Sequence, residues 1–402
     1  MSYTCAVSDQ ARAYAARRYG RPDWAKGTIS RPDAAFLYDL VMEARPQALM
    51  EIGVASGVST AFLSTLLSDR LRDSRLYAFD CETRLYDDRT KPVGAYLLEL
   101  FEQPPANTSL FAGVSSFDIR RVHARPDQYD FVFLDADHKH PAPAMDVLSL
   151  IDIVKPGSWI ALHDISLPLS DPTFRDFGPL YLFQRWPGEK RAPSDPDANI
   201  GAIRLFANIE DSAAALVDCC RLPWQHQPPL QAQAGSLEAL FGLGRGHAEE
   251  LRDIFAAPPV SRGPTLRDCE LVIRGANPWS HFSPDLRSGP LILHANRRDE
   301  PTASISVRGL DARLCRGVVL PNIVRSSETG ATLQLGMSLT AAGGSRQAEQ
   351  CLELADDLPH FAYLTLPASF QQRFDAEFSV RLASDTDSLK GAWVKFKGIH
   401  FV

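Results

Sequence analysis

The sequence has no apolar run long enough to cross a membrane. Its longest candidate, around Val147 to Leu162, is interrupted by Asp152 and by the turn Lys155-Pro156-Gly157. A spanning helix needs about 18 or more consecutive apolar residues. Residues 1–20 also lack an apolar core of signal-peptide length. We therefore expect neither a membrane span nor a secretory leader.

Cysteine is also infrequent, and acidic residues outnumber basic residues. The seven cysteines are scattered, and no pair spaced by two residues recurs, which argues against a disulfide framework or a zinc knuckle and for a reducing, cytoplasmic location. The net charge of −7 argues against a nucleic-acid binder that relies on broad electrostatic attraction. The sequence contains no internal repeat and no low-complexity tract.

With 402 residues, of which 45% are hydrophobic, the chain is long enough for two domains with substantial cores. Its first half alternates apolar residues at helical spacing with short buried runs: QALMEIG, SRLYAFD, YDFVFLDAD, GSWIALHDI and NIGAIRLF. Strands that alternate with helices form a parallel sheet covered on both faces. We therefore predict a Rossmann-like, doubly wound α/β domain over residues 1–210.

The rest of the chain follows two other patterns. Residues 211–258 contain helical stretches around a Pro- and Gln-rich spacer, and we expect them to close the first domain and link it onward. Residues 259–402 contain short runs with period-2 alternation separated by turn residues, which predicts a β-sandwich or jelly-roll accessory domain. The aromatic residues near its start, Trp279 and Phe282 with His281, are interpreted first as packing or assembly residues and second as carbohydrate binders.

The stretch LMEIGVASGVSTAFLSTLL, residues 49 to 67, changes from an apolar run to an amphipathic pattern. It predicts a strand that turns sharply into a helix. Gly53 and Gly57 permit a tight turn and the close approach of a ligand. A Glu51 carboxylate would repel a pyrophosphate and attract a cationic amino acid. The turn therefore suits a nucleoside ligand without phosphates, although a plain strand-to-helix turn has the same pattern.

Asp80 ends the second predicted strand. An acid at that position can accept hydrogen bonds from both hydroxyls of a ribose, and Glu82 is the alternative for the same role. The plainer interpretation is that Asp80 caps the turn that follows it.

Acidic and imidazole side chains gather after two further strands. Because the carboxyl ends of parallel strands meet at one edge of a sheet, we expect Asp135 and Asp164 to converge there. Two carboxylates suit Mg²⁺, Mn²⁺ or Ca²⁺, and His138 suits a general base near neutrality. The alternative is an Asp/His network that only ties loops together. The residues concerned are Asp135, Asp137, His138 and His140 in FLDADHKH, and His163 and Asp164 in ALHDI.

As a group, MEIGVASGVSTAFL, LYAFD, YDFVFLDADHKH, VKPGSWIALHDI and NIGAIRLF resemble the class I S-adenosylmethionine-dependent methyltransferases. The Asp-x-Asp-His string and the later His-Asp pair further resemble the metal-dependent sugar O-methyltransferases of macrolide tailoring, of macrocin and mycinamicin type. This resemblance, over roughly residues 28–206, implies a divalent ion such as Mg²⁺ on Asp135 and Asp164. It also implies a catalytic pair of His138, as general base, and Asp135. The S-adenosylmethionine site implied by the resemblance consists of Glu51, Gly53, Ala55, Ser56 and Gly57, with Asp80 for the ribose.

The chain departs from its catechol-type relatives at two points. Ile165 follows Asp164 where those enzymes carry asparagine, so one ligand is either missing or supplied from elsewhere. Pro141 follows DADHKH where relatives often have an aromatic residue.

These observations predict an enzyme that transfers a methyl group to a hydroxyl of a sugar or of a glycosylated small molecule. Two alternatives stay open: methylation of a catechol or phenol, and a non-catalytic glycan-binding or assembly protein with a degenerate methyltransferase fold. The expected partner is a small-molecule or glycan acceptor and not a nucleic acid, and a homo-oligomer stays open. The insert from Ser166 to Ala198 is expected to lie over the strand ends and shape the acceptor pocket.

Overall fold

The protein is described from a computed structural model. The described residues are 4–122, 129–170, 176–243, 245–256, 258, 270–274, 281–282, 291–294, 303–312, 317–326, 332–355, 360–366, 370, 372–383, 392–396 and 399–401. The chain forms two compact units, Met1–Pro258 and Pro259–Val402. Within the described residues, no helix has both the length and the apolar character needed to cross a bilayer.

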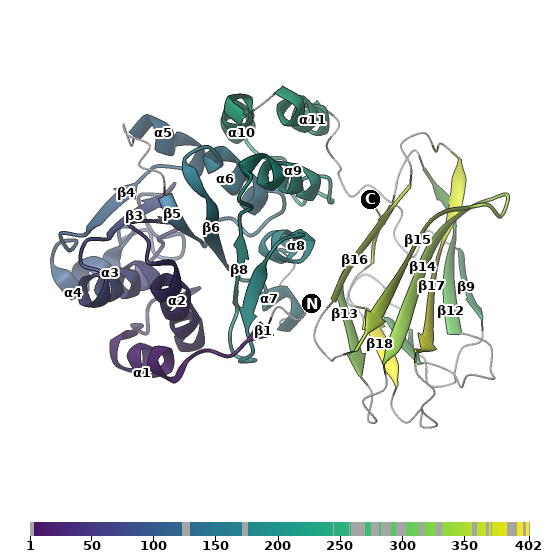
Figure 1. The fold of residues 1–402 in the computed structure, drawn as a ribbon, viewed down its shortest axis with the longest axis horizontal. Helices are drawn as coiled ribbons and strands as arrows, with labels where there is room; N and C mark the ends of the chain where they lie inside the picture. Colours follow the sequence, from purple (N-terminus) through teal and green to yellow (C-terminus); the bar gives the residue numbers. More distant parts are fainter. Residues whose placement is uncertain are drawn as a thin grey trace. The chain divides into compact units, whose positions relative to one another are not determined.

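The first unit is built on one eight-stranded sheet with the order β1-β7-β8-β6-β5-β2-β3-β4 (Figure 1). β2 to β6 run parallel, and β8 is antiparallel to β6 and to β7. This arrangement confirms the predicted doubly wound α/β fold. The strands are β1 (Thr4–Cys5), β2 (Ala48–Ile52), β3 (Arg75–Asp80), β4 (Thr108–Ala112), β5 (Tyr129–Leu134), β6 (Val154–His163), β7 (Lys190–Pro193) and β8 (Ile200–Arg204).

Helices cover both faces of this sheet (Figure 1). α1, α2 and α3 pack on one face, where Phe131, Phe133 and Trp159 of the sheet join their core. α6, α8 and α9 lie on the opposite face, and α10 and α11 pack outside them. The helices are α1 (Asp9–Arg18), α2 (Arg31–Ala44), α3 (Val58–Arg70), α4 (Ala95–Phe101), η1 (Ser116–Asp118), α5 (Ile119–Val122), α6 (Ala142–Leu150), α7 (Leu167–Ser170), α8 (Gly178–Arg185), α9 (Ile209–Cys219), α10 (Leu230–Leu243) and α11 (Arg245–Ala256).

The amino end of α2 shows a complete capping box. The Ser30 hydroxyl accepts a hydrogen bond from the Asp33 backbone, and the Asp33 carboxylate accepts one from the Ser30 backbone. Pro32 lies in the first turn, where its missing N–H costs no helical hydrogen bond. The box places the Asp33 carboxylate in the interior, where it is 1% exposed.

The strand order reverses at β2. β2 leads through α3 to β3 on one side, whereas the chain returns from β4 to β5 on the other side of β2. In open α/β sheets, ligands bind beyond the carboxyl ends of the strands at such a switch point. The fold therefore predicts a ligand site beyond Ile52, Asp80, Leu134 and His163, where β2, β3, β5 and β6 end.

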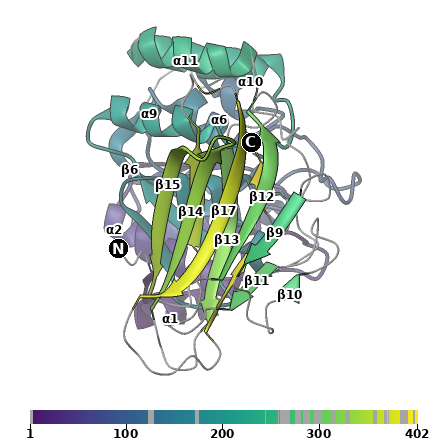
Figure 2. The ribbon, with the colours of Figure 1, turned by 90° about the vertical axis from the view of Figure 1, so that its right-hand side faces the viewer.

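The described residues of the second unit form two antiparallel sheets, as the period-2 sequence predicted (Figure 2). Their orders are β10-β11-β18-β13-β16, with β19 on β13, and β15-β14-β17-β12-β9. Leu335 and Phe378 of one sheet and Val318 and Ile323 of the other share one core. Trp279 lies outside the described residues. The strands are β9 (Glu270–Arg274), β10 (His281–Phe282), β11 (Leu291–His294), β12 (Ala303–Asp311), β13 (Gly317–Ser326), β14 (Leu333–Ala341), β15 (Arg346–Leu354), β16 (His360–Thr365), β17 (Arg373–Leu382), β18 (Trp393–Phe396) and β19 (His400–Phe401).

The structure corrects one element boundary. The sequence placed the buried run from Gly157 onward, after a turn, whereas α6 ends at Leu150 and β6 already begins at Val154. Val154 pairs with Tyr129 and Trp159 pairs with Phe131. The Lys-Pro-Gly stretch is therefore an irregularity within β6 and not a turn before it.

Leu63 of α3 belongs to the core in which this helix packs against the sheet. It is fully buried, whereas Leu100 of α4 is 52% exposed. We predict that Leu63→Ala lowers the free energy of unfolding by about 2–5 kcal/mol, because it removes buried methyl groups and leaves a cavity. Leu100→Ala, the matched control, is expected to cost less than about 0.5 kcal/mol. Urea unfolding measures both, and equal losses would contradict this placement of α3.

Candidate active site

Two glycines shape the turn between β2 and α3. Gly53 has a φ of +88°, and a Cβ there would lie 1.9 Å from the carbonyl oxygen of Asp135. Gly57 has a φ of +85° as the N-cap of α3, and a Cβ there would lie 2.9 Å from the Cα of Gly94. Contacts within the protein therefore account for both glycines, because any side chain would separate the turn from its neighbours.

The carboxylate of Asp80 holds this turn. Its Oδ2 accepts hydrogen bonds from the backbone N–H groups of Val54 (3.0 Å) and Ala55 (2.8 Å), and its Oδ1 accepts one from Glu82 (2.8 Å). Ala55 has a φ of +43°, which is uncommon for a residue with a Cβ, and these hydrogen bonds stabilise it. Asp80 thus caps two loops, while the Glu82 carboxylate pairs with Arg89 at the surface.

Glu51 lies in β2 and is completely buried. Its Oε1 accepts a hydrogen bond from the Ser59 hydroxyl, while Oε2 has no partner among the described residues. Burial raises the pKa of Glu51 to about 8, so the carboxyl group is mainly protonated at neutral pH. The buried Ser56 hydroxyl also lacks a partner within the described chain. The turn therefore contains two buried polar groups with unused hydrogen-bonding capacity.

The structure brings Asp135, His138 and Asp164 together at the ends of β5 and β6. Nε2 of His138 lies 3.0 Å from Oδ2 of Asp164 and 3.5 Å from Oδ1 of Asp135. One donor atom from each side chain lies within 4.8 Å of the other two. Because divalent ions bind oxygen and nitrogen at about 2.0–2.6 Å, three donors at this spacing can share one ion.

Two other residues of the same sequence string do not join this group. Asp137 accepts a hydrogen bond from the Lys139 backbone and lies 3.4 Å from Nδ1 of His226. His140 is completely buried and packs edge-on against the Tyr181 ring. Burial lowers the pKa of His140 to about 3, which keeps this imidazole neutral.

His163 received no role from the sequence, yet its imidazole contacts three carboxylates. Nδ1 lies 3.2 Å from Oδ1 of Asp135 and 3.5 Å from Oδ1 of Asp164, and Nε2 lies 3.5 Å from Oδ2 of Asp33. Sequence reasoning missed Asp33 because its local pattern, the capping box of α2, already explains an acid at that position. Only the approach of α2 to the end of β6 reveals its second contact.

Asn199 supplies an amide beside Asp164, where Ile165 offers none. Ile165 is buried, and its Cδ1 would lie 2.6 Å from a Cβ at Gly201. The Asn199 amide donates to Oδ1 of Asp164, and its own oxygen accepts from the Ser166 backbone N–H at 2.8 Å. Because that N–H can only donate, the orientation of the amide is fixed. Asn199 therefore orients Asp164 with its NH₂ group and does not present an oxygen ligand.

The charges of this cluster balance one another. Although burial opposes ionisation, the imidazoles of His163 and His138 hold the pKa of Asp135 below its usual range. Burial also opposes protonation of both imidazoles, but the carboxylates raise the pKa of His138 and raise that of His163 well above its usual range. Each of these groups therefore has neighbours that favour its charged form, and losing one of them would leave a buried charge uncompensated.

The donor set of the cluster fits a divalent cation. The carboxylates of Asp135 and Asp164 supply hard oxygen ligands, and an imidazole nitrogen completes a mixed set that suits Mn²⁺ and similar ions as well as Mg²⁺. His138 faces both carboxylates with a single atom, Nε2. That atom cannot bind an ion and accept a proton from a substrate at the same time.

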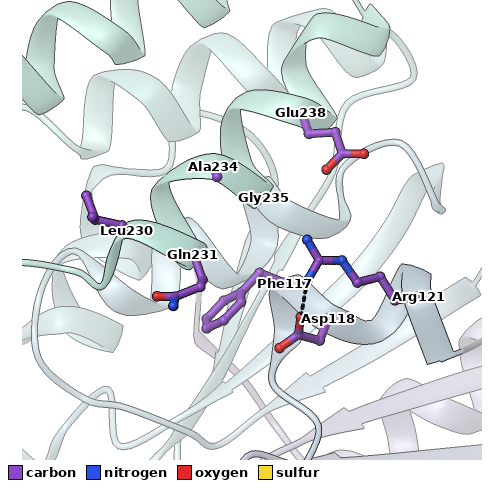
Figure 3. A pocket seen from close by; sticks show the side chains of 8 residues that line it. All are labelled: Phe117, Asp118, Arg121, Leu230, Gln231, Ala234, Gly235 and Glu238. Atoms are coloured by element: carbon purple, nitrogen blue, oxygen red, sulfur yellow. Dashed lines mark hydrogen bonds and ion pairs between the residues drawn. The ribbon is translucent and has the colours of Figure 1, made fainter.

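A hollow of about 250 Å³ lies between the η1–α5 segment and α10 (Figure 3). Phe117, Asp118 and Arg121 line one side, and α10 from Leu230 to Glu238 lines the other. Arg121 pairs with Asp118 across 3.1 Å. No residue predicted for the cofactor or the metal lines this hollow.

Comparisons with known proteins concern the first unit. Residues 50–165 match a family model described as a methyltransferase domain. In structure, the chain is similar to the O-methyltransferase TomG from Streptomyces achromogenes in complex with SAM. The sequence identity is 19%, the match covers 50% of this chain and 91% of TomG, and the TM-score is 0.35. For the SAH complex of an O-methyltransferase from Bacillus cereus, the identity is 17% and the TM-score is 0.34. That match covers 49% of this chain and 91% of the Bacillus cereus chain. No curated protein matches the sequence. The matched residues lie within the part of the chain for which the sequence predicted a methyltransferase domain.

Glu51 is predicted to make the stability of the protein depend on pH. Its pKa rises from 4.5 to about 8 on folding, so its contribution to stability is complete at low pH and is lost as the pH rises. The loss amounts to roughly 1.4 kcal/mol per pH unit between about pH 5 and 8. Glu51→Gln removes this slope, so the variant gains stability over wild type at the alkaline end of the range.

Urea unfolding across this pH range measures the effect. Glu99→Gln, at a carboxylate that is 51% exposed, is the control and is expected to follow the wild-type profile. Wild-type and Glu51→Gln curves that run parallel with pH would contradict the raised pKa of Glu51.

Proposed function

We propose that the chain is an S-adenosylmethionine-dependent O-methyltransferase whose acceptor is a hydroxyl of a sugar or of a glycosylated small molecule. One observation carries the proposal. The methyltransferase-domain match over residues 50–165 coincides with a buried acid and imidazole cluster at the strand ends that also hold the β2–α3 turn. A methyl donor seated on that turn would have a base and a cation site beside it, as aligned displacement requires.

In this proposal the turn from Gly53 through Ala55 and Ser56 to Gly57 receives the methionine part of the donor. S-adenosylmethionine supplies a methyl group already activated by the positive sulfonium. The unpartnered Oε2 of Glu51 and the Ser56 hydroxyl offer hydrogen-bond acceptors for its ammonium group. An ammonium beside Glu51 would also favour the charged carboxylate and lower its raised pKa.

Asp80 is proposed to hold the ribose. A carboxylate has roughly four lone-pair positions, and three of those of Asp80 accept backbone N–H groups. The remaining position, on Oδ1, has room for one hydroxyl. The proposal therefore gives Asp80 one ribose hydroxyl, whereas the sequence led us to expect both.

His138 is proposed as the general base. Its side chain is 26% exposed, against 5% for His163, so it is the imidazole within reach of an entering hydroxyl. Asp135 and Asp164 orient it through Nε2. These two carboxylates would hold a divalent ion, Mg²⁺ or Mn²⁺, and a bound ion supplies charge that stabilises an alkoxide.

The orientation of Asn199 favours a sugar-type over a catechol-type acceptor. The catechol-type relatives are expected to place an asparagine oxygen on the ion. Here the amide oxygen is occupied by Ser166 and only the NH₂ group faces Asp164. The second unit is proposed as an accessory module for glycan binding or assembly.

Isothermal calorimetry with S-adenosylmethionine tests the donor site. We predict binding by wild type and a loss of at least about 10-fold in Asp80→Ala, because a charge-assisted hydrogen bond is worth about 1.5–3 kcal/mol. Asp130→Ala is the matched control, since Asp130 likewise accepts two consecutive backbone N–H groups, those of Gln47 and Ala48. It is expected to retain wild-type affinity. Absence of binding by wild type would reject the proposal.

Transfer of a labelled methyl group to a panel of glycosides and catechols tests the chemistry. Asp135→Asn is expected to lower the transfer rate by about 100-fold or more while keeping the affinity for S-adenosylmethionine, because Asp135 contacts both imidazoles and not the β2–α3 turn side chains. Transfer to catechols alone would replace the sugar acceptor with a phenolic one. Full transfer by Asp135→Asn would contradict the proposed site.

A further inference from the structure

Two imidazoles face the Asp135–Asp164 pair, and His163 is the more deeply buried one. Its Nδ1 lies 3.2 Å from Oδ1 of Asp135 and 3.5 Å from Oδ1 of Asp164. In an octahedral site with bonds of about 2.1–2.3 Å, adjacent donors lie about 3.0–3.3 Å apart. Nδ1 is therefore spaced from each carboxylate oxygen nearly as a neighbouring ligand of one ion would be.

Asp33 lies on the opposite side of the same ring. Its Oδ2 is 3.5 Å from Nε2 of His163, and the residue is 1% exposed. Backbone N–H groups of Ser30 and Asn199, each at 2.7 Å, hold the two carboxylate oxygens in place. A buried carboxylate behind an imidazole keeps a proton on the nitrogen that it faces and presents the other nitrogen to a metal. Asp33 thus aims Nδ1 of His163 at the two acids.

We propose that His163, positioned by Asp33, is a donor of the cation site, which makes it a mixed oxygen and nitrogen centre that prefers Mn²⁺ to Mg²⁺. Imidazole is a good ligand for transition-metal ions, whereas Mg²⁺ prefers oxygen. With His163, Asp135 and Asp164 as ligands, Nε2 of His138 is not required as a ligand of the ion. The inference rests on the proposed function only in placing an acceptor beside this ion.

Binding of Mn²⁺ to the full chain, followed by electron paramagnetic resonance of the free ion, tests the proposal. His163→Gln is the main variant, because a glutamine amide reaches toward Asp33 but has no atom at the Nδ1 position. We expect wild type to bind Mn²⁺ more tightly than Mg²⁺ in competition, and His163→Gln to lose at least 10-fold in Mn²⁺ affinity. His138→Gln, the matched imidazole variant, is expected to change the affinity less than about threefold.

A second pair of variants tests the role of Asp33. Asp33→Asn is expected to weaken Mn²⁺ binding about 10- to 100-fold. Asp39→Asn lies on the same helix and removes a carboxylate that bonds Ser8, so it is expected to bind Mn²⁺ like wild type. This pair also decides the outcome should His163→Gln fail to fold, and circular dichroism establishes folding for each variant.

Three results would overturn the inference: no Mn²⁺ binding by wild type at millimolar ion, loss of affinity in His138→Gln with full affinity in His163→Gln, or wild-type affinity in Asp33→Asn. Calorimetry with S-adenosylmethionine on the same samples separates the two hypotheses. Mn²⁺ binding without S-adenosylmethionine binding rejects the proposed function and leaves the cation site standing. The reverse pattern rejects the cation site alone.

Discussion

The first unit depends on burying several carboxylates at one rim of a parallel sheet and balancing their charge with imidazoles. Asp33 lies in α2, Asp135 and Asp164 directly follow β5 and β6, and His138 and His163 lie between these acids. An uncompensated charge in such a place costs several kcal/mol. The imidazoles to which the proposed function gives a chemical role therefore also stabilise the packing of three segments that are distant in sequence.

The two halves of the rim neutralise their acids in different ways. On the side of the β2–α3 turn, Asp80 is occupied by backbone N–H groups and Glu51 is kept mainly protonated by burial. On the other side, the imidazoles of His163 and His138 hold the pKa of Asp135 below its usual range. A cationic sulfonium donor would meet uncommitted acceptor atoms on the first side, and an alcohol would meet a base or cation on the second. Under the proposed function, this division would place the donor and the acceptor on opposite sides of one reaction centre.

The sequence predicted the sheet, the turn and the acids at the strand ends, because hydrophobic periodicity defines strands and the ends of parallel strands meet. It did not separate His138, which joins the cluster, from His140, which is buried against Tyr181. It also missed Asp33 and Asn199. Both have complete local explanations, a helix cap and a strand start, and their second contacts arise only when α2 and β8 approach β6. Tertiary contacts of this kind leave no periodic signal.

The central claim is that the acids at the carboxyl ends of β2, β3, β5 and β6 form one methyl-transfer site. The crystal structure of the full chain with S-adenosylhomocysteine tests this claim most directly. The account predicts the amino acid part of the ligand over the β2–α3 turn, a ribose hydroxyl on Oδ1 of Asp80, and the sulfur facing His138 and Asp135. A ligand seated elsewhere, for example between η1 and α10, or a sulfur pointing away from the imidazoles, would contradict it.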